Sequence, residues 1–299
     1  MSRLLRGPLR GTLTFALIVG NTLICCTPLF LVALAKLVVP LPAWRRVARR
    51  RLTAIAELWI AINTRILRAT QPTRWETRGL EGLRRDQWYL VIANHRSWVD
   101  IFALQAACNR RIPLLKFFLK QPLRWVPVMG LAWSALDMPF LQRHSRAQLQ
   151  RYPELRGADL ATTRRACERF RDVPTAILSF VEGTRFTPAK RVSGGAPYRH
   201  LLAPRAGGIA SALGALGTLL PEVLDVTLAY PEGAGGFWDL CCGRVPRVVL
   251  EIARRPLAPW LAAGDYTADP EFRTRFQRWL GGLWTAKDAR LAELLAVRD

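Results

Sequence analysis

The sequence has little lysine and few acidic residues. Of its 299 residues, 22 are aspartate or glutamate and 44 are lysine or arginine, and five of those 44 are lysine. The resulting net charge of +22 attracts polyanions, either nucleic acid or an anionic membrane surface. The chain has no zinc-finger spacing, no RNP-like aromatic strand and no basic zipper, which argues against a nucleic-acid partner. The charge therefore favours membrane lipids.

Cysteine is also scarce. The six cysteines include the adjacent pairs Cys25-Cys26 and Cys241-Cys242, and no C-x-x-C spacing occurs. Neither a disulfide framework nor a metal site is predicted, which favours a reducing, cytosol-facing domain. The sequence also lacks the Gly-x-Ser-x-Gly elbow of serine hydrolases, and the glycines from Gly207 to Gly217 match neither a dinucleotide-binding nor a Walker loop.

One long apolar run lies near the N-terminus. Leu13 to Ala35 contains no charged residue and is long enough to cross about 30 Å of hydrocarbon as a helix. Three arginines precede the run, whereas Lys36 and the arginines between Arg45 and Arg51 follow it. By the positive-inside rule, the chain after residue 36 is expected to face the cytosol, at a bacterial inner membrane.

Two alternatives apply to this run. Ala33-Leu34-Ala35 has the small-x-small pattern of a signal-peptide cleavage site, although the run is longer than a usual signal core and basic residues follow directly. Gly20, Asn21 and Pro28 could kink the helix, so a re-entrant segment that does not cross the bilayer is the second alternative.

A second apolar stretch, Leu52 to Leu67, has arginines on both sides. Glu57 and Arg65 lie inside it and disfavour a deep span, so we expect an amphipathic helix in the membrane interface. An ordinary core-packing helix is the alternative. The sequence thus divides into a membrane anchor over residues 1–70 and a catalytic domain over residues 71–299.

After residue 72, short apolar runs alternate with helix-like stretches. Runs typical of buried strands are Trp88–Ala93, Leu114–Leu119, Thr175–Val181, Val223–Tyr230 and Arg247–Ile252. The helix-like stretches are Trp98–Cys108, Ala158–Arg171 and Ile209–Leu216. Asp269-Pro270-Glu271 starts a last helix, which could break at Gly281-Gly282. The pattern predicts an α/β fold, with a mixed, largely parallel sheet covered by helices.

The first element with chemical character follows the strand Trp88–Ala93. The segment NHRSWVD places His95 and Asp100 at a strand-to-helix turn. Positions five apart point about 140° away from each other on a regular helix, so the pair meets only if Asp100 reaches back to a histidine before the helix. A carboxylate on one imidazole nitrogen would leave the other free to accept a proton from a substrate hydroxyl. A structural histidine that caps the turn is the alternative.

The second element follows the strand Thr175–Val181. Glu182-Gly183-Thr184-Arg185 puts a carboxylate, a flexible backbone step, a hydroxyl and a guanidinium in one loop. A guanidinium is suited to bidentate recognition of phosphate.

Together and in this order, the two elements resemble the 1-acylglycerol-3-phosphate acyltransferase family, a family of glycerolipid acyltransferases with an HxxxxD motif. Four looser blocks are similar to that family in the same order: Leu119–Gly130, Met138–Arg143, Leu201–Arg205 and Asp225–Pro231. The Met138–Arg143 block departs from the commonest form at Pro139 and Gln142, which leaves the acceptor preference open. The resemblance covers roughly residues 72 to 255.

The resemblance implies acyl transfer from acyl-CoA or acyl-carrier protein to the hydroxyl of a lysophospholipid, without metal or other cofactor. His95 would act as the general base, and Asp100 would orient it. The residues expected to hold the acceptor's glycerol phosphate are Arg143, Glu182, Gly183, Thr184, Arg185 and Lys120. A surface position for the lysine is an equal alternative. His144 and His200 have no partner at motif spacing and are expected to be structural.

Two other functions fit the same fold. One is a thioester hydrolase that uses the His95–Asp100 pair with water, which the missing Gly-x-Ser-x-Gly elbow disfavours. The other is a non-catalytic lipid-binding protein of the membrane surface, which the intact His95, Asp100 and Glu182–Arg185 positions disfavour.

Overall fold

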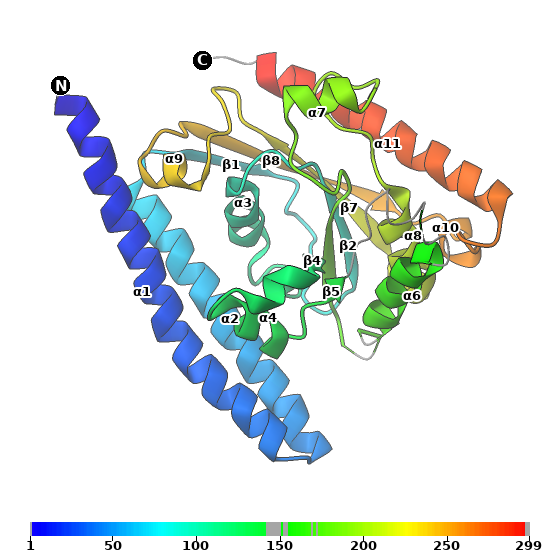
Figure 1. Ribbon diagram of the computed structural model, residues 1–299, viewed down its shortest axis with the longest axis horizontal. Helices are drawn as coiled ribbons and strands as arrows, with labels where there is room; N and C mark the ends of the chain where they lie inside the picture. The colour runs from blue at the N-terminus through cyan, green and yellow to red at the C-terminus, as the bar shows by residue number, and fades with distance from the viewer. Residues whose placement is uncertain (1, 142–150, 152–154, 169, 172, 297–299) are drawn as a thin grey trace.

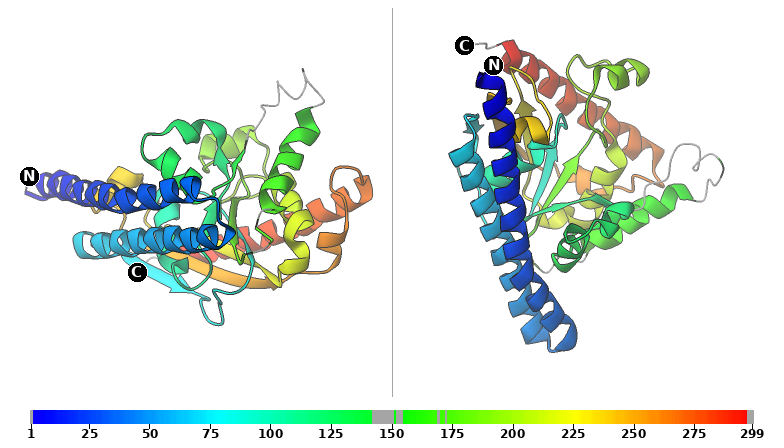
Figure 2. Two further views of the ribbon diagram at one scale, coloured as in Figure 1. Left: turned by 90° about the horizontal axis from the view of Figure 1, so that it is seen from below. Right: turned by 60° about the vertical axis from the view of Figure 1, so that its left-hand side comes forward.

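Two long helices precede an α/β domain in the computed structural model (Figure 1). The structure describes residues 2–141, 151, 155–168, 170–171 and 173–296. Helix α1 (Ser2–Val38) and helix α2 (Pro42–Thr70) run antiparallel and lie side by side in both views of Figure 2. They cover one side of the domain, and helix α11 (Pro270–Ala296) lies on the opposite side.

A six-stranded sheet forms the centre of the α/β domain. In spatial order its strands are β1 (Arg74–Arg78), β8 (Arg247–Pro256), β7 (Glu222–Ala229), β2 (Tyr89–Ala93), β6 (Ala176–Phe180) and β3 (Leu115–Phe117). Neighbouring strands pair in parallel except β7 and β8, which are antiparallel. The predicted fold class, a mixed and largely parallel sheet, is confirmed.

Helices cover both faces of this sheet, which explains why its central strands are continuous apolar runs. Leu90 and Ile92 of β2 face a core formed with helix α8 (Ala206–Leu216) and α11. Tyr89 and Val91 face the opposite core, formed with helix α3 (Val99–Cys108) and the helix pair. The alternation of β2 side chains between two cores fixes its register with β6 and β7.

Shorter elements connect these parts. They are β4 (Leu119–Lys120), η1 (Gln121–Trp125), α4 (Met129–Ala135), β5 (Phe140–Leu141), α6 (Leu155–Glu168), α7 (Pro188–Ser193), η2 (Gly217–Leu219), α9 (Phe237–Cys241) and α10 (Trp260–Ala263). Strands β4 and β5 form a separate parallel pair. Helix α4 packs against α1 and α2, and Lys36 of α1 forms an ion pair with Asp137 just after α4.

Helix α1 is long and apolar enough to cross a membrane over Gly7–Val38, by length and composition. Gly20 and Pro28 do not interrupt it, because the helix is continuous from Ser2 to Val38. Much of its outer surface is apolar and exposed, at Leu13, Leu23, Ile24, Leu31, Leu34 and Leu37. Whether α1 crosses the bilayer or lies within one leaflet stays a prediction.

The inner side of the helix pair shares its core with the sheet. Ile18 of α1 and Leu67 of α2 belong to the same buried cluster as Tyr89 of β2. Asn21 donates to Asn63 at 2.8 Å, which fixes the two helices against each other. The predicted anchor, residues 1–70, is therefore packed along the α/β domain rather than attached through a linker.

One face of α2 packs inward, as in the core-packing alternative. Leu52, Ala56 and Ile60 are buried, and the buried Glu57 forms an ion pair with Arg85 at 2.6 Å. The arginines at the start of α2 are exposed. Contact of that arginine-rich face with lipid stays a prediction.

Candidate active site

The loop after β2 is fixed by one buried asparagine. The Asn94 side chain donates to the carbonyl oxygen of Leu228 at 2.9 Å and accepts the Leu228 backbone N–H at 2.8 Å. These two hydrogen bonds have the same donor and acceptor pattern as a pair of backbone bonds between strands, and they hold the loop against β7. His95 is thus held at the carboxyl end of the central strand β2, where ligand sites of parallel sheets occur.

Asp100 reaches back from the first turn of α3 to His95, as the sequence predicts. The distance from His95 Nδ1 to Asp100 Oδ2 is 2.7 Å, and the Asp100 side chain is fully buried. The same oxygen accepts the backbone N–H groups of Arg96 at 2.6 Å and Ser97 at 2.9 Å. A carboxylate only accepts, so Nδ1 carries the proton and Nε2 is left with a free lone pair.

Tyr230 holds the other oxygen of this carboxylate. Its hydroxyl donates to Asp100 Oδ1 and is buried. Burial and the adjacent Asp100 charge raise the pKa of Tyr230 well above its usual value, so the hydroxyl remains a donor. Sequence reasoning missed this role because Tyr230 reads as the last apolar residue of a buried strand. The signal that could have found it is a phenol at the end of β7, which neighbours β2.

Glu182 holds the backbone around His95. One oxygen accepts the His95 N–H at 3.1 Å, the other accepts the Leu202 N–H at 3.1 Å, and the side chain is buried. Burial raises the pKa of Glu182 to about 7, although the two N–H donors and the charges of Arg96 and Lys287 oppose this shift. Contact of Glu182 with the acceptor stays a prediction, and its hydrogen bonds support a positioning role.

Gly183 lets the loop turn toward His95. Its φ of 70° lies in the left-handed region, which glycine adopts without strain because it has no Cβ atom. The preceding Phe180 ring stacks on the imidazole of His95, with 4.0 Å between centroids and 14° between planes. After the turn, the Phe186 N–H donates to the His95 carbonyl oxygen at 2.7 Å. The loop thus contacts both the ring and the backbone of His95.

Arg185 and Thr184 lie on the outer side of this loop. The Arg185 guanidinium is 5.1 Å from the centroid of the Trp98 ring. Within the described part of the chain Arg185 forms no ion pair, so its charge is not neutralised by a described carboxylate. Lys190 of α7 donates to Thr184 Oγ1 at 2.7 Å and to the Arg185 carbonyl oxygen at 3.1 Å. Sequence reasoning missed Lys190, which adds a further cation at this loop.

The structure describes two of the four other residues singled out in the sequence. Arg143 and His144 lie outside the described residues. The backbone of Lys120 lies in β4 and pairs with Leu141 of β5. The backbone N–H of His200 donates to Asp288 at 2.7 Å, which agrees with the structural role expected for it.

Helix α11 is linked to the site by hydrogen bonds. Trp284 donates to the Leu202 carbonyl oxygen at 3.0 Å, and Asp288 accepts the N–H groups of Arg199 and His200. Leu202 in turn donates to Glu182, so a continuous set of hydrogen bonds joins α11 to His95.

A charged residue of α11 is buried close to this set. Lys287 is fully buried, lies 2.5 Å from Asp225 Oδ1, and also donates to the Val226 carbonyl oxygen. Burial lowers the pKa of Lys287, and the Asp225 charge opposes that shift. Neither Lys287 nor the partners of α11 could be found from the sequence, because they come from distant segments without a motif.

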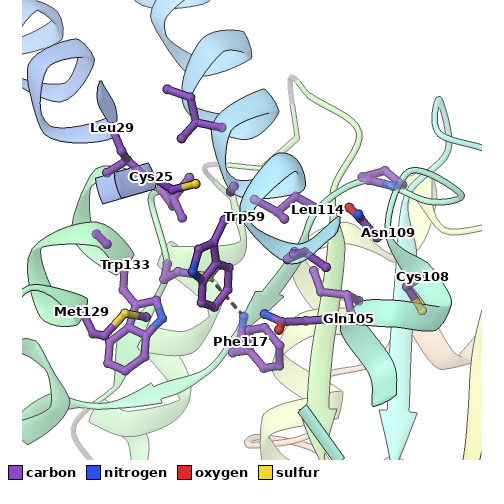
Figure 3. A pocket seen from close by; sticks show the side chains of 18 of the residues that line it. Cys25, Leu29, Trp59, Gln105, Cys108, Asn109, Leu114, Phe117, Met129 and Trp133 are labelled. Atoms are coloured by element: carbon purple, nitrogen blue, oxygen red, sulfur yellow. Dashed lines mark hydrogen bonds between the residues drawn. The ribbon is translucent and has the colours of Figure 1, made fainter. Parts of the chain in front are cut away.

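A cavity lies between the helix pair and the sheet (Figure 3). Its walls come from α1, α2, α3, β3 and α4, and Figure 3 shows Trp59, Phe117 and Trp133 gathered around the same space. The walls are mainly apolar, with Cys25, Leu29, Ile60, Leu115 and Met138 among them. Strands β3 and β2 both pair in parallel with β6, and the register places Phe117 at the end of β3 level with Val91 of β2.

The described residues do not form a metal-binding group, because no three histidine, cysteine, aspartate or glutamate side chains among them could hold one ion together. All six cysteines are free and buried.

Known proteins are similar to this chain in sequence and in fold. A family model described as Acyltransferase matches residues 74–230. The 1-acyl-sn-glycerol-3-phosphate acyltransferase 2 of Brassica oleracea is 28% identical over 227 residues, which cover 70% of this chain and 52% of that protein. The 1-acyl-sn-glycerol-3-phosphate acyltransferase gamma of Mus musculus is 28% identical over 213 residues, covering 67% and 51%. The chain thus spans about half the length of these relatives.

The fold also matches a solved structure. The crystal structure of the 1-acyl-sn-glycerophosphate acyltransferase of Thermotoga maritima superposes with a TM-score of 0.59 over 99% of both chains, at 19% sequence identity. At this identity the match concerns the fold, and it includes the N-terminal helices because nearly the whole chain is covered.

Proposed function

This chain belongs to the acyltransferase family, and on that premise we propose that it transfers a fatty acyl group from a thioester donor to the hydroxyl of 1-acylglycerol-3-phosphate or a similar lysophospholipid. One observation carries the proposal. The buried Asp100 orients His95 so that Nε2 is free, next to a loop with the sequence Glu-Gly-Thr-Arg. The names of the relatives, 1-acyl-sn-glycerol-3-phosphate acyltransferases, support this acceptor.

The reaction starts when His95 Nε2 accepts the proton of the acceptor hydroxyl. The hydroxyl oxygen attacks the thioester carbonyl carbon, and Asp100 stabilises the imidazolium that forms. The tetrahedral intermediate then breaks its carbon–sulfur bond, and the imidazolium returns the proton to the leaving thiolate. The products are an ester and a free thiol. General-base catalysis of this kind contributes on the order of 10²–10⁴-fold in rate.

The acceptor's phosphate would bind at the loop after β6. Arg185 offers a planar guanidinium that its contact with Trp98 keeps oriented, and Thr184 offers a hydroxyl. Gly183 allows the backbone to approach the ligand closely. Arg143 and Lys120 are further phosphate ligands in this proposal, as the family resemblance implies.

The fatty acyl chain of the donor would enter the apolar cavity between the helix pair and the sheet. Its lining is mainly apolar, which suits a hydrocarbon chain. The helix pair closes one side of this cavity, so the chain would bind where the protein also meets the bilayer. Acyl-CoA and acyl-carrier protein are both suitable donors, and the catalytic domain would face the cytosol in a bacterial inner membrane.

The proposal is tested by thiol release from acyl-CoA in the presence of detergent and lysophosphatidate. Thiol release that depends on the acceptor supports acyl transfer, whereas release without acceptor would indicate a hydrolase. We expect His95→Ala to lower kcat/KM by about 10²-fold or more while the protein remains folded. His200→Ala is the matched control, because that ring belongs to no catalytic pair. Near-normal turnover by His95→Ala would contradict the mechanism.

A further inference from the structure

A second guanidinium lies beside the catalytic pair. Arg96 follows His95 directly, and its backbone N–H donates to Asp100 at 2.6 Å. The half-buried side chain places its guanidinium carbon 4.3 Å from the centroid of the Phe186 ring. The Phe186 N–H in turn donates to the His95 carbonyl oxygen at 2.7 Å. The guanidinium is therefore held at a fixed place relative to the imidazole.

The protein itself does not neutralise the Arg96 charge. Both oxygens of the nearby Glu182 accept backbone N–H groups, and Asp100 is bonded to His95 and Tyr230. Across the described segments, the guanidinium takes part in no hydrogen bond and no ion pair. Burial lowers the pKa of Arg96, and the nearby carboxylates only partly offset the lost hydration. A half-buried cation with unused donors favours an anionic ligand.

Arg96 is one of several cations near His200. Burial lowers the pKa of His200, and the nearby charges of Arg96, Arg199 and Arg191 lower it further, against the opposing charge of Asp288. The Asp288 carboxylate accepts the backbone N–H groups of Arg199 and His200. Three guanidinium groups thus lie near His200, and their field attracts anions.

Arg96 over Phe186 and Arg185 over Trp98 form two stacked guanidinium groups near His95. Stacking on an aromatic ring keeps the planar group oriented, and that group matches the oxygens of a phosphate. Resting on the proposed function, we propose that Arg96 binds a substrate phosphate group beside His95, in addition to the phosphate site at Arg185.

Two substrates could supply this phosphate. One source is the phosphomonoester of the acceptor, which would then lie between Arg185 and Arg96. The other source is the coenzyme A part of an acyl-CoA donor. The chemistry at Arg96 is the same in both cases, and separate kinetics for donor and acceptor distinguish them.

The test compares Arg96→Gln and Arg96→Lys with the wild-type full-length protein in detergent. Arg278→Gln is the matched control, because it removes an exposed arginine of α11. KM is measured for lysophosphatidate and for acyl-CoA separately. Loss of a charge-assisted hydrogen bond is expected to raise one of the two KM values about 10-fold or more in Arg96→Gln. Arg96→Lys keeps the charge without the planar group and should lie between the wild type and Arg96→Gln.

The outcomes separate the two sources. A rise in the lysophosphatidate KM assigns Arg96 to the acceptor phosphate, and a rise in the acyl-CoA KM assigns it to the donor phosphate. Unchanged KM values in Arg96→Gln would overturn the proposal. An equal rise for both substrates with a lowered melting temperature would also overturn it, because that result indicates a structural role.

A binding measurement keeps this test independent of turnover. Coenzyme A or lysophosphatidate should raise the melting temperature of the wild type more than that of Arg96→Gln. Equal shifts in both proteins for both ligands would contradict phosphate binding by Arg96. Failure of the proposed function gives a different result, namely no acceptor-dependent thiol release by the wild type.

Discussion

Glu182 is a carboxylate in an unfavourable place for a negative charge. It is buried, and burial raises its pKa from an ordinary 4.5 to about 7. Two backbone N–H groups that donate to its oxygens limit that rise. The folded protein therefore binds a proton at Glu182 between these two pH values, whereas the unfolded chain does not.

This difference predicts that stability falls as the pH rises from about 5 to 8. The pKa of Glu182 is higher in the folded protein than in the unfolded chain. Its contribution to the free energy of unfolding is therefore fully present below the pKa of the unfolded chain, and it is lost as the pH rises through the pKa of the folded protein. A shift of this size corresponds to roughly 3 kcal/mol. In Glu182→Gln, which cannot titrate, the free energy of unfolding measured with urea should vary less over this range.

Glu271→Gln is the control for that measurement, since Glu271 is exposed at the start of α11. It should keep the wild-type pH dependence. If Glu182→Gln also keeps the full wild-type slope, the buried carboxylate does not titrate in this range.

Sequence reasoning reached the reactive pair but not the residues that support it. The reach of Asp100 back to His95 is confirmed, because that geometry follows from the spacing at a strand-to-helix turn. Tyr230 and Lys190 were missed, since each contacts its partner through the folded chain without a motif of its own. The family predicted from the two motifs is confirmed by the matching family model.

Helix α11 contributes no residue to the His95–Asp100 pair, but hydrogen bonds connect it to the site. Asp288 accepts the N–H groups of Arg199 at 2.8 Å and His200 at 2.7 Å. In the same segment, the Leu202 N–H donates to Glu182. Movement of this segment would change the hydrogen bond from the His95 backbone to Glu182. A helix far from His95 in sequence can therefore affect its position.

We expect Asp288→Ala to lower kcat more than it changes the KM of either substrate. The substitution leaves two backbone N–H groups without their acceptor, which costs about 1–3 kcal/mol of stability. Asp269→Ala is a matched control, because Asp269 also accepts two backbone N–H groups, at the start of the same helix. Both variants should lose similar stability, measured by thermal unfolding.

The two variants should differ in turnover. If Asp269→Ala loses as much kcat as Asp288→Ala, the effect comes from general destabilisation of α11 and not from the segment that supports Glu182.

Burial of the strand faces explains which strands the sequence predicted and which it missed. Strands β2, β6 and β7 were predicted because both of their faces are covered, which makes them continuous apolar runs. Strand β1, with the sequence RWETR, was missed because it lies at the sheet edge and keeps charged side chains.

The last helix, which could have broken at its glycine pair, is continuous. Helix α11 continues through Gly281 and Gly282, although each glycine costs about 1 kcal/mol relative to alanine. Burial of Phe276, Leu280 and Trp284 on either side outweighs that cost.

At the scale of the whole molecule, α1 and α2 offer two different surfaces to a bilayer. The exposed apolar residues of α1 include Leu31, Leu34 and Leu37, and the start of α2 exposes a cluster of arginines. Each basic residue near an anionic surface contributes about 1 kcal/mol, and salt screens that contribution. Apolar contacts depend little on salt.

We therefore expect two kinds of variant to differ in vesicle flotation. Replacing Arg45, Arg46 and Arg50 with glutamine should weaken binding to anionic vesicles at low salt, and high salt should remove the difference from wild type. Replacing Leu31, Leu34 and Leu37 with glutamine should weaken binding to neutral and anionic vesicles at any salt. If the arginine variant loses binding equally on neutral vesicles, its surface does not act through charge.

Ile18 of α1 packs in the same cluster as Tyr89 of the sheet, so a bilayer that covered α1 would be a ligand of the native state. Lipid that covers the outer face of α1 binds the folded protein and not a chain whose helix pair has separated. By mass action such a ligand stabilises the fold, by about 2.7 kcal/mol at a hundredfold excess over its dissociation constant. Chains that never reach a membrane would lack this stabilisation and become better substrates for proteases. Attachment to lipid would then determine how much of the protein escapes degradation. The active protein would be confined to the membrane in which its substrates are dissolved.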